Sequence, residues 1–92
     1  MENLYRATIE RWGVDAQYDQ AIEECAELIA ALKHYQRGKI TRQAVIDELA
    51  DATLMLGQLR WMFGEDQVDA AVSKKLSKLS DLMATTDKDE KG

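Results

Sequence analysis

Two pairs of acidic residues lie in the middle of the chain, and in each pair the residues are three positions apart. Glu24 and Glu27 form the first pair, and Glu48 and Asp51 form the second. In an α-helix, residues three apart share a face, so each pair presents two carboxylates side by side. Four carboxylates that meet in a protein interior must take up protons or hold cations, because like charges repel and burial disfavours the ionised form.

The neighbours of each pair along its helix face indicate that the acids point inward. The stripe through Glu48 and Asp51 is otherwise apolar and contains Ala44, Met55, Leu59 and Met62. The stripe through Glu24 and Glu27 begins at Gln20 and continues with Ala31 and Tyr35. Apolar stripes of this kind face a protein core. We therefore expect the two acid pairs to meet between two packed helices.

The ligand types favour magnesium at this position. Ligation by oxygen alone suits Mg²⁺, which binds at about 2.0–2.1 Å and keeps waters, or Mn²⁺ as a substitute, whereas zinc sites are rich in His and Cys. The chain has one histidine and one cysteine. We therefore predict a Mg²⁺ site formed by the residues of the two pairs. The alternative is that all four are solvated acids of an acidic helical protein.

Further candidate residues lie around this site. Glu23 is either a solvated acid or an outer ligand or base that takes a proton from water, and Gln20 is a candidate for substrate binding. Lys75 and Lys78 either extend into solvent or bind phosphate oxygens. Trp12 either anchors the first helix on the core or forms a wall on which a base stacks.

Composition predicts one small all-α domain. The 92 residues are 46% hydrophobic and 32% charged, with no Pro and five Gly, which favours helices over a fold rich in turns. Capping residues predict four helices. Asn3 caps the first, which ends near Trp12, and Asp15 caps the second, which ends at Arg37. The third covers residues 42–63 after Thr41, and the fourth runs from about Glu65 to Met83. We expect residues 1–83 to form the domain and residues 84–92 a mobile polar tail.

The apolar residues exceed what one small domain can cover. The second helix presents a core face of Ile22, Cys25, Ile29 and Leu32, broadened by Ala21, Ala26 and Leu28, and the third is apolar nearly all round. Such a helix needs neighbours on several sides, and a small domain often gains them by self-association. We expect a homodimer or a dimer of dimers.

Net charge and the absence of long apolar runs exclude several partners. The formal charge of −5 disfavours binding to a nucleic-acid polymer or an anionic membrane. No apolar run approaches the ~20 residues of a membrane span, and the first residues lack the features of a signal peptide. We expect a cytoplasmic protein.

Several stretches of the sequence are similar to one family of enzymes. The segments Glu23-Glu24-Cys25-Ala26-Glu27-Leu28 and Glu48-Leu49-Ala50-Asp51, joined by a helical hairpin, resemble the MazG-like all-α nucleoside triphosphate pyrophosphohydrolases, which are related to dimeric dUTPases. Arg11-Trp12-Gly13 and Lys75-Leu76 extend the resemblance over roughly residues 12–79.

This resemblance implies a specific activity and fold. The activity is Mg²⁺-dependent hydrolysis of a nucleoside triphosphate between its α and β phosphates, which gives a monophosphate and pyrophosphate. Glu24, Glu27, Glu48 and Asp51 match the metal-binding acids of the family, and Lys75 and Lys78 match its basic positions less closely. The implied fold is a four-helix, bundle-like MazG-type fold with long central helices, completed by dimerisation. The alternative is a catalytically idle relative that binds a nucleotide or a protein.

Overall fold

The computed structural model describes residues 1–91, and the side chains of residues 1–85. Over this part of the chain it contains four α-helices and no strand: α1 (Glu2–Trp12), α2 (Val14–Gln36), α3 (Arg42–Phe63) and α4 (Glu65–Lys91). The predicted all-α class is confirmed. None of the helices in the described residues is long and apolar enough to cross a membrane.

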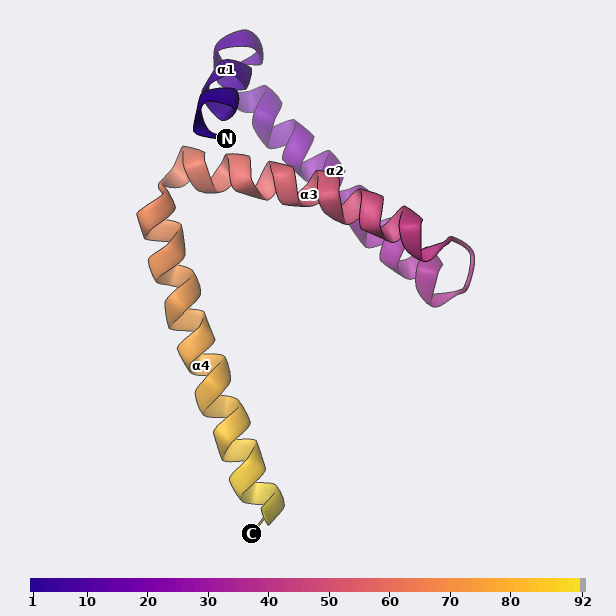
Figure 1. The fold of residues 1–92 in the computed structure, drawn as a ribbon, viewed down its shortest axis with the longest axis vertical. Coiled ribbons are helices and arrows are strands. Elements are labelled where there is room, and N and C mark those ends of the chain that lie inside the picture. The colour runs from indigo at the N-terminus through magenta and orange to yellow at the C-terminus, as the bar shows by residue number, and fades with distance from the viewer. Residues whose placement is uncertain (92) are drawn as a thin grey trace. The chain divides into compact units, whose positions relative to one another are not determined.

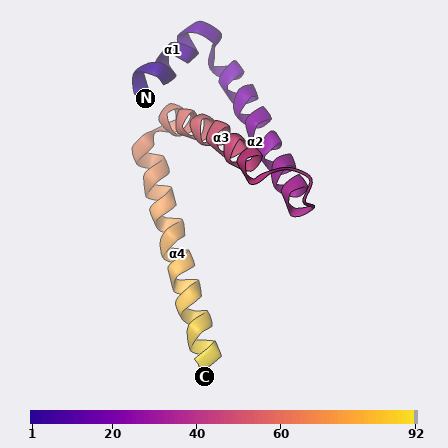
Figure 2. The same cartoon turned by 45° about the vertical axis from the view of Figure 1, so that its right-hand side comes forward.

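The chain divides into two compact units. The first is Met1–Met62 and contains α1, α2 and nearly all of α3, while the second begins at Phe63 and contains α4. Within the first unit, α2 and α3 form a hairpin and lie side by side, and α1 lies at the end of the hairpin opposite its turn (Figures 1 and 2). The acidic motifs of α2 and α3 therefore belong to one unit.

Two of the predicted helix starts are correct, and two caps are wrong. Thr41 caps α3, because its Oγ1 accepts a hydrogen bond of 3.2 Å from the amide of Ala44, and α4 begins at Glu65 as expected. Asn3 lies inside α1, which begins one residue earlier with Met1 at the N-cap. Asp15 lies in the first turn of α2, whose N-cap is Gly13.

A single glycine explains the early start of α2. Gly13 has a φ of 89°, a conformation that glycine adopts without the steric penalty of a side chain. The chain therefore passes from α1 into α2 at this one residue, and the second helix begins at Val14. Asp15 still stabilises α2, because a carboxylate in the first turn interacts favourably with the helix dipole.

The last helix is longer than expected. It continues past Met83 to Lys91, since no Gly or Pro interrupts residues 84–91. The backbone of the predicted tail is thus helical as far as Lys91. Its mobility stays a prediction, and Gly92 lies outside the described residues.

The buried side chains of the first unit are small or amidic. Among the described residues, those classed as buried are Gln17, Ala21, Ala31, Ala52 and Gln58. The predicted core face of α2 is wrong at Ile22, which is 67% exposed, and at Ile29 and Leu32, which are also exposed, but it is correct at Ala21, which is buried. The helix is rotated so that Ala21, Glu24, Cys25, Leu28 and Ala31 are at least partly buried. On α3 the predicted inward stripe is at least partly buried except at Asp51, which is exposed.

Polar side chains attach α1 to the hairpin. Gln58 Nε2 donates to the backbone oxygen of Tyr5 at 3.2 Å, and the Thr8 hydroxyl lies 2.7 Å from that same oxygen and 3.1 Å from Gln58 Oε1. Gln17 Nε2 lies 3.4 Å from the backbone oxygen of Thr8. Because Gln17 and Gln58 are buried, these bonds satisfy amide groups that would otherwise be costly to remove from water.

One aromatic contact brings α1 very close to α3. The rings of Tyr5 and Trp61 are 6.4 Å apart between centroids, and the guanidinium of Arg6 lies 5.8 Å from the centroid of Trp61. The Tyr5 hydroxyl occupies the space that a Cβ at Gly57 would need. Glycine inside a helix lowers stability by about 0.5–1 kcal/mol relative to alanine. The close approach of Tyr5 explains why position 57 is nevertheless a glycine.

We expect the substitution Gly57→Ala to lower the free energy of unfolding in the natural background, because the new methyl group displaces Tyr5. In a Tyr5→Phe background the hydroxyl is gone, so the same substitution should be neutral or stabilising by up to about 1 kcal/mol through its helix propensity. Chemical denaturation of the four proteins of this cycle measures the difference. Equal effects of Gly57→Ala in both backgrounds would contradict the proposed contact.

Candidate functional site

The structure brings together three of the four predicted metal ligands. One carboxylate oxygen from each of Glu24, Glu27 and Glu48 lies within 4.8 Å of the other two. Glu24 and Glu27 come from α2 and Glu48 from α3, so the cluster spans the two helices of the hairpin. We call these three residues the glutamate cluster. Three of the four acids thus lie close together across the two helices, although Glu27 and Asp51 are exposed and do not point inward as predicted.

Asp51 and Glu23 lie beside the glutamate cluster. Both are exposed, and both carry charges that act on Glu24 and Glu27 by electrostatic repulsion. Asp51 lies three residues after Glu48, on a part of α3 that faces more toward solvent. The structure thus places the fourth predicted ligand within electrostatic reach of the cluster but outside the group of three.

Gln20 contacts the cluster directly. Its side-chain Nε2 donates a hydrogen bond of 2.8 Å to Glu24 Oε1. The bond joins residues one helical turn apart and fixes one oxygen of the carboxylate. Lys75 and Lys78 lie on α4 in the second unit, and both are exposed. Their predicted contact with phosphate stays a prediction.

Crowding of the carboxylates changes their acidity. Partial burial raises the pKa of Glu24 above its ordinary value of 4.5, and repulsion from Glu27 and Asp51 raises it further, while the hydrogen bond from Gln20 acts in the opposite direction. Desolvation also raises the pKa of Glu27, although this residue is exposed, and repulsion from Glu48 and a hydrogen bond that protonated Glu27 shares with Glu48 raise the pKa further. The cluster therefore favours bound protons or cations.

Two oxygens of the cluster lie out of contact with solvent and have no hydrogen-bond partner. These atoms are Glu24 Oε2 and Glu48 Oε2. An ionised oxygen without a partner or water is unfavourable, so this arrangement needs a positive partner. A proton on Glu27 would supply one hydrogen bond, and a cation would satisfy several oxygens at once.

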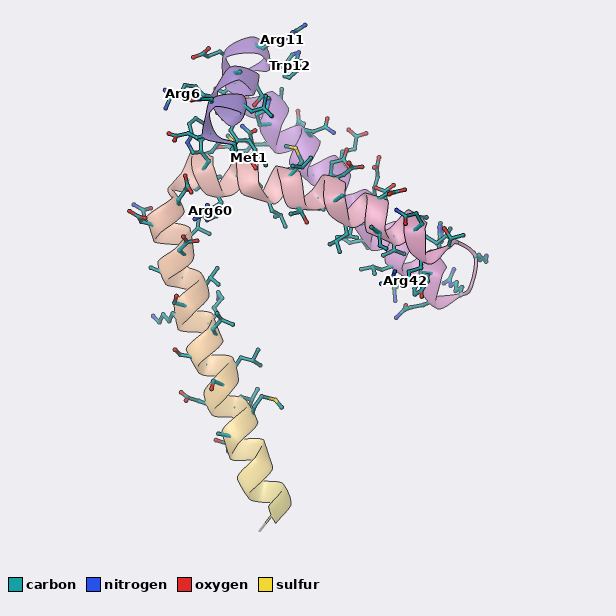
Figure 3. The ribbon with its side chains drawn as sticks, viewed as in Figure 1. Met1, Arg6, Arg11, Trp12, Arg42 and Arg60 are labelled. Atoms are coloured by element: carbon teal, nitrogen blue, oxygen red, sulfur yellow. The ribbon has the colours of Figure 1, made fainter. Side chains whose placement is uncertain are left out.

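A cavity adjoins the cluster at Gln20. It has a volume of about 630 Å³ and lies among α1, α2 and α3 of the first unit. It is lined by Met1, Leu4, Tyr5, Thr8, Trp12, Ala16, Gln17, Gln20, Leu54, Met55 and Gln58. Trp12 lies at the end of α1 beside Arg11, whose guanidinium is 5.1 Å from the centroid of the indole ring (Figure 3). We call this cavity the α1 pocket.

The sequence identifies two residues of the α1 pocket as candidates for substrate contact and does not identify its other lining residues. Trp12 and Gln20 were candidates for substrate contact, whereas Gln17 and Gln58 were not. The available signal was Gln58 itself, a polar residue on a helix that is otherwise largely apolar. A polar residue in such a position marks a buried hydrogen bond or a site, although nothing local shows which of the two.

Comparisons of the chain with known protein families, with curated proteins and with solved structures find no match. The resemblance to the MazG-like enzymes therefore rests on the residues that carry it. Three of these, Glu24, Glu27 and Glu48, form the glutamate cluster.

The raised pKa values predict an unusual pH dependence for the metal-free protein. The folded state holds protons on Glu24 and Glu27 more tightly than the unfolded state does. In the unfolded state each carboxyl group has its ordinary pKa of 4.5. Their contribution to stability is therefore fully present below pH 4.5 and is lost as pH rises through the raised values. We expect the free energy of unfolding, measured by denaturant titration in EDTA, to fall as pH rises above 4.5.

The variants Glu27→Gln and Glu10→Gln separate the cluster from the rest of the protein. Glu27→Gln removes one of the crowded acids and should flatten this fall, whereas Glu10→Gln alters an exposed acid of α1 outside the cluster and should leave it unchanged. Equal pH profiles for all three proteins would show that the carboxylates do not interact in solution.

Proposed function

We propose that this protein is a Mg²⁺-dependent nucleoside triphosphate pyrophosphohydrolase of the MazG-like type. It would hydrolyse an NTP or dNTP between the α and β phosphates, giving a nucleoside monophosphate and pyrophosphate. The observation that carries the proposal is the meeting of Glu24, Glu27 and Glu48 from two neighbouring helices. These three residues belong to the two acidic motifs that resemble the family, at the positions where the family binds metal.

The residues of the cluster fit a hard divalent cation. Mg²⁺ favours oxygen ligands, and the cluster offers three carboxylate oxygens within 4.8 Å of one another. The unpartnered oxygens of Glu24 and Glu48 provide free ligand positions. Asp51 would complete the set of four acids, and Mn²⁺ would substitute for Mg²⁺ because both favour carboxylate oxygen.

The chain's own residues have distinct roles in this reaction. When bound, Mg²⁺ supplies charge neutralisation at the phosphates and acidifies a nucleophilic water. Glu24, Glu27, Glu48 and Asp51 would hold it, and the exposed carboxylate of Glu23 beside them would accept a proton of the attacking water. The water oxygen would bond to the α phosphorus as the bond from this phosphorus to the oxygen that bridges it to the β phosphorus breaks, and pyrophosphate leaves with the bridging oxygen. Lys75 and Lys78 remain candidates for binding phosphate oxygens from their sequence alone.

A second copy of the chain would complete the fold as a MazG-type dimer or dimer of dimers. Support comes from the large apolar side chains that the single chain leaves exposed. Those outside the α1 pocket include Ile22, Ile29 and Leu32 on α2, Ile46, Leu49 and Leu56 on α3, and Val72, Leu76, Leu79, Leu82 and Met83 on α4. No large side chain of the described residues is fully buried. Covering these faces would provide the core that a 92-residue chain lacks.

The net charge and the proposed substrate bear on the cellular location and the binding partners of the protein. A protein with a formal charge of −5 repels nucleic-acid polymers and anionic membranes. A small triphosphate whose charge is offset by bound cation remains compatible with the acidic cluster. We accordingly propose a cytoplasmic enzyme that acts on free nucleotides.

Incubation with a panel of NTPs and dNTPs in the presence of Mg²⁺ tests the activity. We expect at least one substrate to yield pyrophosphate and a monophosphate, and Glu48→Gln to reduce the rate by at least about a hundredfold, because removal of a cation ligand weakens stabilisation of the transition state. Chromatography of the nucleotide products measures both. Nucleotide binding without pyrophosphate release would support the catalytically idle alternative.

Thermal stability supplies the control for this experiment. Mg²⁺ at a hundredfold excess over its dissociation constant should stabilise the natural protein by about 2.7 kcal/mol. Glu48→Gln should lose this effect and, by relieving repulsion, stabilise the metal-free protein. Glu10→Gln should retain both the activity and the response to Mg²⁺. If Mg²⁺ leaves the stability of the natural protein unchanged, the metal site is wrong.

Self-association is tested by a matched pair of substitutions on α4. Val72, Leu76, Leu79 and Met83 recur every three or four residues and so share one face. Leu79→Glu should weaken self-association at least about tenfold, since burial of a leucine contributes about 1.5–3 kcal/mol, while Ser80→Glu should have little effect. Light scattering gives the masses, and a natural protein that is monomeric at micromolar concentration would contradict the proposal.

A further inference from the structure

The α1 pocket has the character of a site for a small organic molecule. Its volume of about 630 Å³ lies within the range of roughly 300–1,000 Å³ that is usual for such sites. Most of the lining is aliphatic or aromatic, and its polar side chains are amides and hydroxyls. None of the lining side chains is charged. The lining contains no Lys, Arg or His side chain to bind a phosphate group, whereas a flat uncharged ring would find apolar surface and a few hydrogen-bonding groups.

Trp12 provides the surface on which such a ring can stack. It lines the pocket although 60% of its surface is exposed to solvent. Arg11 lies over the indole at 5.1 Å from its centroid, and a guanidinium at this distance contributes a cation–π interaction. Because Arg11 covers one face of the ring, the opposite face is available to a ligand. Stacking on an aromatic residue stabilises bound bases in nucleic-acid-binding proteins.

Gln20 belongs to both the pocket and the glutamate cluster. It lines the pocket, and its Nε2 donates to Glu24 Oε1 at 2.8 Å. A glutamine amide has two N–H donors and one carbonyl acceptor, so this bond leaves one donor and the acceptor for a ligand. A molecule that is uncharged at one end and carries phosphates at the other could occupy both regions.

We propose that the α1 pocket holds the base of the nucleotide and that Gln20 makes binding of the base and binding of the cation interdependent. The assignment of the ligand rests on the proposed function, whereas the pocket itself does not. A cation on the unpartnered Oε2 of Glu24 draws charge from the carboxylate and weakens the bond from Gln20 to Oε1, which makes the Gln20 amide a better partner for the base. Binding at the two regions is then positively coupled, and the coupling is the same in either order.

Nucleosides test the pocket without requiring hydrolysis. The variant Trp61→Phe leaves Trp12 as the sole tryptophan and keeps an aromatic ring against Tyr5. We expect at least one of the four common 2′-deoxynucleosides to quench its fluorescence saturably, while 2-deoxyribose 5-phosphate, which lacks a base, does not. If no nucleoside binds, the pocket is not a base site, even for a protein that hydrolyses triphosphates.

Paired substitutions locate the binding. Ala16→Leu inserts a larger side chain into the pocket and should weaken nucleoside binding by about tenfold or more, whereas Ala7→Leu makes the same change at an exposed position of α1 outside the lining and should not. If Ala16→Leu does not fold by circular dichroism, Leu54→Ala replaces it, with Leu56→Ala as its control. Equal affinity in a variant and its control would overturn the proposal.

Calorimetric titration with and without Mg²⁺ tests the role of Gln20. Mg²⁺ should raise nucleoside affinity by about fivefold or more, and Gln20→Leu should remove this dependence while nucleosides still bind. If Mg²⁺ stabilises the protein but does not change nucleoside affinity, the link through Gln20 is wrong and the metal site stands. Nucleoside binding without release of pyrophosphate from any triphosphate would support the base site and refute the proposed hydrolysis.

Discussion

Repulsion among carboxylates at the contact between α2 and α3 is the constraint on which the first unit depends. Glu24, Glu27 and Glu48 place three oxygens within 4.8 Å of one another, and the Oε2 atoms of Glu24 and Glu48 are shielded without a partner. In water such residues would separate. Here the hairpin holds them together, so the folded state carries an unfavourable interaction that a proton or a cation can relieve.

The residues around this cluster explain how the helices tolerate it. Ala21, Ala31 and Ala52 are buried, and small side chains allow helices to lie close together. The larger aliphatic residues of α2 are displaced to exposed faces. Within one chain, the positions that would ordinarily form the core are thus occupied by alanine, glutamine and acids. Most burial of apolar surface must therefore come from contacts outside the single chain. The acidic site is in this way connected to the proposed self-association.

Much of this arrangement followed from sequence, and the exceptions have physical causes. The all-α class, the bounds of α3 and the Thr41 cap were predictable because they depend on local spacing and capping. The meeting of Glu24 with Glu48 followed from the stripes on which they lie. The rotation of α2 did not, because acidic and aliphatic stripes compete for the inward direction, and only the partner helix decides between them. The α1 pocket was not predictable because Gln58 and Tyr5, more than fifty residues apart, meet through tertiary contacts.

The connection between α1 and α2 has a further consequence. Gly13 is the only residue between these helices, so the rotational phase of α1 is coupled directly to that of α2. One inserted residue in this stretch would turn a helix by about 100° about its axis and carry Trp12 away from Gln20. The turn over residues 37–41 lies at the other end of the hairpin (Figure 1), so changes in its length would leave that geometry intact. Variation among homologous chains should therefore be concentrated in the second connection and absent from the first.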